Sequence, residues 1–171
     1  MLQLKSISKA AIPQALEKAL RYRLLNEPQE AESICRDVLA VERENQAALV
    51  TLLLALTDQF STDFTRAREE ALKVLARLHG DYEQAYYEGI VHERWAHAQL
   101  SRNMPGAFAL SWLHEAMRCY EKAEQVSKPD MADAVLRWNT CARYLQQHPL
   151  EEAQASEIRD VEAEYADEGP R

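Results

Sequence analysis

The chain has 171 residues, of which 47% are hydrophobic, with only four glycines and six prolines. This composition supplies an apolar core and few turn residues, so it argues against a disordered chain or a sheet protein and favours an all-α fold. The formal net charge is −8, but residues 150–171 hold eight carboxylates against two arginines and so carry −6 of it. A near-neutral body lacks the clustered positive charge that nucleic acids and anionic membranes attract, so we expect neither as a partner.

The three cysteines indicate the compartment. Cys35, Cys119 and Cys141 are far apart, odd in number and set among apolar residues of helical spacing. They are typical of small buried hydrophobic residues in a reducing compartment. The N-terminus lacks the apolar region of a signal peptide, and the longest apolar run, Ala47–Leu56, is too short to span a membrane. We expect a cytoplasmic protein.

Turn and capping residues divide the first half of the chain into helical segments. Asn26, Glu27 and Pro28 end a first helix and begin a second, because proline suits the first helical turn. Asn45 is able to cap a third helix, and residues 61–63 supply capping oxygens for a fourth. These segments predict two antiparallel hairpins.

The sharpest break lies at residues 80 and 81. Gly80 is suited to the left-handed conformation that ends a helix, and Asp81 followed by Gln84 matches a capping box. Three more breaks, at residues 103–106, 127–130 and 147–149, mark the ends of a fifth, a sixth and a seventh helix. The apolar spacing of three and four between the breaks is the period of helices.

The segment of residues 15–45 resembles a tetratricopeptide repeat. The matching places are small, aromatic, turn and apolar positions, held here by Ala19, Tyr22, Pro28, Ala31, Cys35 and Val38. Residues 47–78 resemble a second repeat with Leu53 at the small-residue place and a longer turn. Residues 82–128 resemble a third, with Gly89 at that place and longer helices. Residues 130–147 would then be an unpaired first helix.

The resemblance implies an architecture and a binding surface. The architecture is a right-handed stack of antiparallel hairpins, with about seven helices over residues 1–149, followed by an acidic tail over residues 150–171. First helices of such stacks line a concave face that receives the ligand. In this register the face gathers Leu16, Leu20, Arg23, Val50, Leu54, Tyr86, Ile90, Arg94, Leu136, Thr140, Arg143 and Tyr144. Its aliphatic character favours an apolar peptide or helix over an acidic chain end.

The sequence contains only weak candidates for a metal-binding or catalytic site. His92 and His97 are five residues apart, and Glu88 lies four before His92, but neither HExxH nor the Glu-x-x-His pairs of di-iron bundles occur. We interpret them as acid–imidazole pairs on a helix surface and predict no metal and no other cofactor. Nucleophile elbows and phosphate-binding loops are also missing from the sequence, so we expect no enzyme.

These observations favour a protein-interaction scaffold or adaptor that binds a peptide or helix of another protein in an apolar concave groove. The alternative is a structural, self-assembling protein whose apolar stripe is buried in a homodimer. In the tail, Ile158, Val161 and Tyr165 fall on one face of a possible helix that would cap or cover this stripe. A solvated terminus is the other interpretation of residues 150–171.

Overall fold

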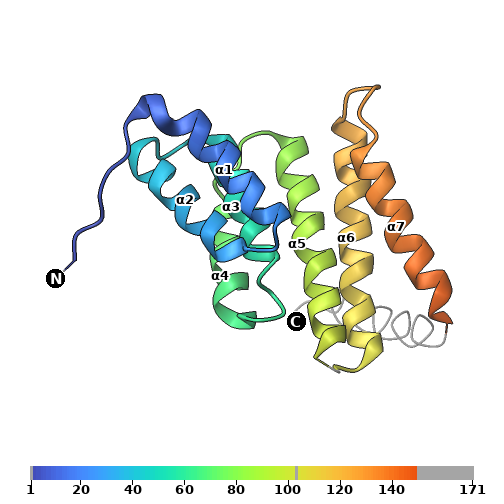
Figure 1. The fold of residues 1–171 in the computed structure, drawn as a ribbon. Coiled ribbons are helices and arrows are strands. Elements are labelled where there is room, and N and C mark those ends of the chain that lie inside the picture. Colours follow the sequence, from blue (N-terminus) through green and yellow to red (C-terminus); the bar gives the residue numbers. More distant parts are fainter. Residues whose placement is uncertain (1, 103, 150–171) are drawn as a thin grey trace, which may run out of the picture. The chain divides into compact units, whose positions relative to one another are not determined.

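The computed structural model describes residues 2–102 and 104–149, and in them the chain is helical without a strand. The predicted all-α class is therefore confirmed, and the tail residues Ile158, Val161 and Tyr165 lie outside the described residues. These residues form one 3-10 turn and seven α-helices (Figure 1), in the order η1 Lys9–Ala11, α1 Ile12–Leu24, α2 Pro28–Val41, α3 Gln46–Thr57, α4 Phe64–Leu75, α5 Asp81–Ser101, α6 Gly106–Val126 and α7 Asp133–Gln147.

The helix ends show which capping predictions hold. Pro28 occupies the first turn of α2, and the side chain of Asn45 accepts a hydrogen bond of 3.0 Å from the backbone N–H of Ala48. Gly80 has a φ of 94°, the left-handed conformation predicted for it. The predicted cap of α4 is wrong, because Asp63 makes no capping hydrogen bond and its carboxylate instead pairs with Arg66 in the same turn.

The chain divides at Gly80 into two compact units, Met1–Gly80 and Asp81–Arg171. We call them the first unit and the second unit and describe each by itself. No helix in the described parts combines the length and the apolar character that crossing a membrane requires.

In the first unit each helix packs against the next one along the chain, and α1 also contacts α3. The small residues Ala19 of α1 and Ala31 of α2 are completely buried, which allows the helices around them to approach closely. Helix α3 is apolar on nearly all sides and supplies more of the core than any other helix of the unit, with Leu49, Leu53 and Leu56 fully buried. The first unit therefore has a hydrophobic core of its own.

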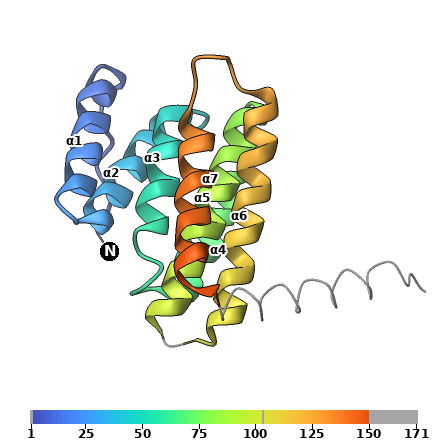
Figure 2. The ribbon, with the colours of Figure 1, turned by 90° about the vertical axis from the view of Figure 1, so that its right-hand side faces the viewer.

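In the second unit α6 packs against both α5 and α7 (Figure 2). Helices α5 and α6 approach closely at Gly89, where an added Cβ would lie 2.5 Å from Cε1 of the Tyr120 ring. Tyr120 is completely buried, and Ile90 and Leu113 are buried in the same helix pair. The missing side chain at Gly89 thus provides the space that the tyrosine ring fills.

Candidate functional site

The accessible stripe of α3 is narrow and mostly apolar. Most of the helix is buried, and its least buried positions after the first turn are Val50, Leu54 and the C-cap residue Asp58. Their spacing of four residues places them along one side of the helix. This stripe holds both of the α3 residues that the sequence predicts for the binding face.

Helix α1 contributes a parallel stripe. Leu16 is half-buried, whereas Leu20 is 46% exposed one turn later. At the end of the stripe Nε of Arg23 donates a hydrogen bond of 2.8 Å to Oδ2 of Asp58, and this ion pair is mostly shielded from water. Because α1 also packs against α3, the two stripes run along neighbouring helices, and this ion pair joins them at one end. We call Leu16, Leu20, Val50 and Leu54 the α1–α3 face.

Two further leucines next to this face were not predicted from the sequence. Leu24 is 88% exposed and continues the stripe of Leu16 and Leu20 by one more turn, and the adjacent Leu25 is 60% exposed. Their apolar character is visible in the sequence, but their exposure depends on α1 being the outer helix of the first unit. Arg23, by contrast, is engaged by Asp58 within the chain.

In the second unit the residues predicted for the binding face are not all accessible. Ile90 is 1% exposed and belongs to the core, so its assignment to a binding face is wrong; the stretched α5 turns this position toward the interior of the unit. Tyr86 and Arg94 are half-buried on α5, while Leu136, Thr140 and Arg143 are exposed on α7. The ring of Tyr144 lies 5.2 Å from that of His97 and 4.5 Å from that of His148.

A buried polar cluster joins the three helices of the second unit. Glu93 of α5 has a side chain only 5% exposed. It accepts a 2.6 Å hydrogen bond from the Tyr120 hydroxyl and a 3.0 Å hydrogen bond from Nη1 of Arg137 on α7. Burial and the adjacent carboxylate raise the pKa of Tyr120, so its hydroxyl remains a donor. We call these three residues the Glu93 cluster.

A hollow of about 230 Å³ opens beside the Glu93 cluster, lined by Glu93, His97, Thr140, Cys141, Arg143, Tyr144 and Gln147. Its strongest potential nucleophile is Cys141, which is 2% exposed. Burial, reinforced by the charge of Glu93, raises the pKa of the Cys141 thiol to about 12. A thiol that stays protonated is a poor nucleophile, so this hollow does not favour covalent catalysis.

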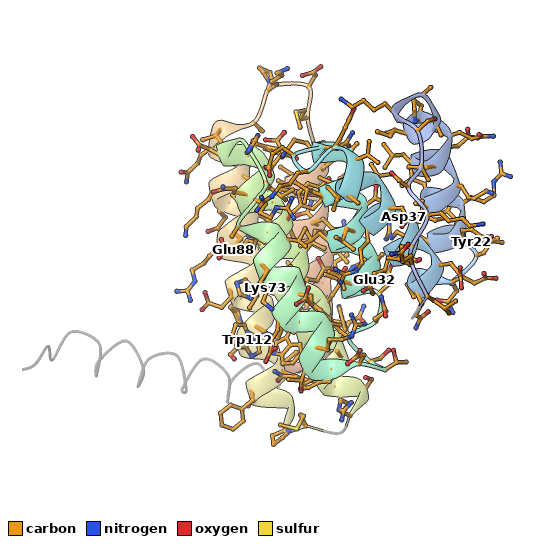
Figure 3. All side chains as sticks on the ribbon, turned by 90° about the vertical axis from the view of Figure 1, so that its left-hand side faces the viewer. Tyr22, Glu32, Asp37, Lys73, Glu88 and Trp112 are labelled. Carbon is orange, nitrogen blue, oxygen red and sulfur yellow. The ribbon has the colours of Figure 1, made fainter. Side chains whose placement is uncertain are left out.

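The first unit has its own buried carboxylate. Glu32 of α2, labelled in Figure 3, is 9% exposed and accepts hydrogen bonds of 2.7 Å from Gln59, 3.0 Å from Arg66 and 2.8 Å from Arg36. Burial alone would raise the pKa of Glu32, but these three donors outweigh it and hold the pKa below its usual value of 4.5. The carboxylate links α2 to α4 and to the end of α3.

Replacing Glu32 by glutamine should destabilise the protein by about 2 kcal/mol near neutral pH, because charge-assisted hydrogen bonds to a buried carboxylate are lost. Since the folded pKa of Glu32 is lowered, its contribution is present above the unfolded pKa and is lost as the pH falls through the folded one. Urea unfolding from about pH 7 to about pH 3 should show the two proteins converging in acid. Glu30→Gln, an exposed position on α2, is the control; a pH-independent difference for Glu32→Gln would contradict the assignment.

One group of side chains has the donor types of a metal site. Glu88 and His92 of α5 and Cys119 of α6 place one ligand atom each within 4.8 Å of one another. The sequence predicts an acid–imidazole pair for Glu88 and His92, and their atoms are indeed 3.9 Å apart. Cys119 was not predicted to join them, because it is 27 positions beyond His92 in the sequence and reaches it only through the packing of α5 on α6.

Comparison with protein-family models, with curated proteins and with solved structures finds no match to this chain.

Proposed function

We propose that this protein is a tetratricopeptide-like interaction module that binds an amphipathic helix or apolar peptide of another protein on the α1–α3 face. The observation that carries the proposal is the exposure of Leu20 and Leu24 beside the partly accessible Val50 and Leu54. Apolar side chains aligned on adjacent helices are typical of surfaces that are covered in a complex.

The geometry suits a helical ligand. Two packed helices lie about 8–10 Å apart, and the groove between them accepts apolar side chains spaced three and four residues apart on a third helix. Burying a fully exposed leucine contributes about 1.5–3 kcal/mol to the free energy of binding. Leu24 is almost fully exposed, whereas Leu20 is already about half covered and would contribute less. The Arg23–Asp58 ion pair bridges the two helices at one end of the α1–α3 face and gives the face a polar rim there.

The double substitution Leu20→Asp and Leu24→Asp should abolish capture of the partner from an extract of the source organism, because two carboxylates would have to be desolvated in the complex. Leu136→Asp is the matched control: it changes an exposed leucine on α7, which the sequence also predicts for the concave face but which lies outside the α1–α3 face, so it should leave capture intact. The helical circular dichroism of all three proteins should be the same. Capture that survives the double substitution, or that fails equally with Leu136→Asp, would contradict the proposal.

The same face would also be covered if the protein formed a homodimer. Sedimentation velocity separates the two cases: the proposed module sediments as a monomer with or without the double substitution. A dimer that Leu20→Asp and Leu24→Asp dissociate would replace partner binding by self-assembly.

A further inference from the structure

We propose that Glu88, His92 and Cys119 form a zinc-binding site on the second unit, independent of the α1–α3 face. The group combines a carboxylate oxygen, an imidazole nitrogen and a thiol sulfur, which are the three protein ligand types of Zn²⁺. Three protein ligands leave a fourth position for water, as in zinc sites that are open to solvent.

The two ligands on α5 have the spacing that a metal requires. Glu88 and His92 are four residues apart, so both side chains project from the same side of the helix, as the two histidines of zinc-binding helices do. Nε2 of His92 lies 3.9 Å from Oε1 of Glu88. Metal–ligand bonds of about 2.0–2.3 Å in a tetrahedron separate neighbouring ligand atoms by about 3.3–3.8 Å, so this pair is close to its bound spacing.

The third ligand is brought in by the close approach of α5 and α6. Gly89 comes directly after Glu88, and Tyr120 comes directly after Cys119, and Gly89 and Tyr120 pack against each other between the two helices. The missing side chain at Gly89 therefore determines how near Cys119 comes to the two ligands on α5. The three ligand atoms lie within 4.8 Å of one another, and the half-exposed side chain of Glu88 can change rotamer to bring its carboxylate closer without moving either helix.

The surroundings hold the ligands in place and leave access to solvent. The imidazole of His92 stacks on the indole of Trp112, labelled in Figure 3, with ring centres 5.2 Å apart, and this contact restricts its rotation. Cys119 is 5% exposed, the side chain of His92 is 16% exposed and that of Glu88 is 46% exposed. An ion thus reaches the site from the Glu88 side. Binding replaces the proton of the Cys119 thiol by the metal ion, and the proton passes to solvent.

The experiment uses the full chain with Zn²⁺ and Co²⁺ as probes. Titration calorimetry should give one Zn²⁺ per chain, and Zn²⁺ should raise the midpoint of thermal unfolding because it binds only the folded arrangement. Co²⁺ should produce a near-ultraviolet absorption band from charge transfer between the thiolate and the metal. Zn²⁺ should displace the Co²⁺ ion and remove this band.

Variants separate this site from adventitious binding. His92→Ala and Cys119→Ala should remove the cobalt band. Glu88→Gln changes a half-exposed side chain and should not disturb folding. It should weaken Zn²⁺ binding by about tenfold or more, because even the loss of a residue that only hydrogen-bonds to a metal ligand weakens binding by that much. His79→Ala and Cys141→Ser change a histidine and a cysteine outside the group and should leave Kd unchanged. No thiolate–cobalt band in the unaltered protein, or an unchanged Kd for Glu88→Gln, would overturn the proposal.

Discussion

Replacing Arg137 by methionine should lower the free energy of unfolding by about 3 kcal/mol, because it leaves the carboxylate of Glu93 buried without its cation. Glu93 has a side chain only 5% exposed, whereas that of Arg137 keeps 34% exposure, which places the effect at the lower end of the usual range for a broken buried pair. The Tyr120 hydroxyl would remain as a donor to Glu93, but one neutral hydrogen bond does not replace the lost charge. Chemical denaturation at neutral pH measures the change.

Two companion proteins test the cause of this loss. Arg143→Met removes an exposed arginine from the same helix and should change stability by no more than about 0.5 kcal/mol. Adding Glu93→Gln to Arg137→Met removes the unpaired charge while keeping an acceptor for Tyr120, so it should restore part of the stability. Equal losses for Arg137→Met and Arg143→Met would show that the pair with Glu93 contributes nothing.

A leucine in place of Gly89 should destabilise the protein by about 3 kcal/mol, near the upper end of the usual cost of overpacking a core. Its Cβ alone would lie 2.5 Å from the Tyr120 ring, which is fully buried and cannot move aside without displacing α6 from α5. The better helix propensity of leucine offsets about 1 kcal/mol at most, so the steric effect dominates. Thermal and urea unfolding both measure the result.

Glu83→Leu is the matched control, because it introduces the same side chain at an exposed position of α5 and should change stability by about 0.5 kcal/mol or less. Gly89→Ala should lie between the two, since it adds only the Cβ. An unchanged unfolding midpoint for Gly89→Leu would mean that α5 and α6 do not approach as closely as the structure shows.

The sequence predicts most of the helix ends correctly, because they depend on residues within one turn of each other. Pro28, Asn45 and Gly80 act through their own backbone or the next turn, and each takes the predicted role. Asp63 did not, because Arg66 in the same turn competes for its carboxylate. Capping is therefore predictable only where no stronger charged partner lies within reach.

In the second unit, contacts between residues far apart in the sequence could not be predicted from local patterns. Ile90 is an apolar residue on a helix that mixes apolar and charged residues all along its length, and the apolar period alone does not show which side of α5 is covered by α6. The partners Glu93 and Arg137 are separated by 44 positions, and charged residues are usually solvated, so nothing in the local pattern predicts the burial of Glu93. The same limit applies to Cys119, whose neighbours on α5 are set by helix packing.

Each unit also holds one sealed thiol away from the proposed zinc ligands, Cys35 in the first and Cys141 in the second, with exposures of 0% and 2%. Burial raises the pKa of both thiols to about 12, so neither reacts with an alkylating reagent while its surroundings stay closed. The rate at which each cysteine becomes labelled therefore reports the opening of its own half of the chain. Equal labelling rates for Cys35 and Cys141 would show that the two units open together, and different rates would show that each unit opens separately.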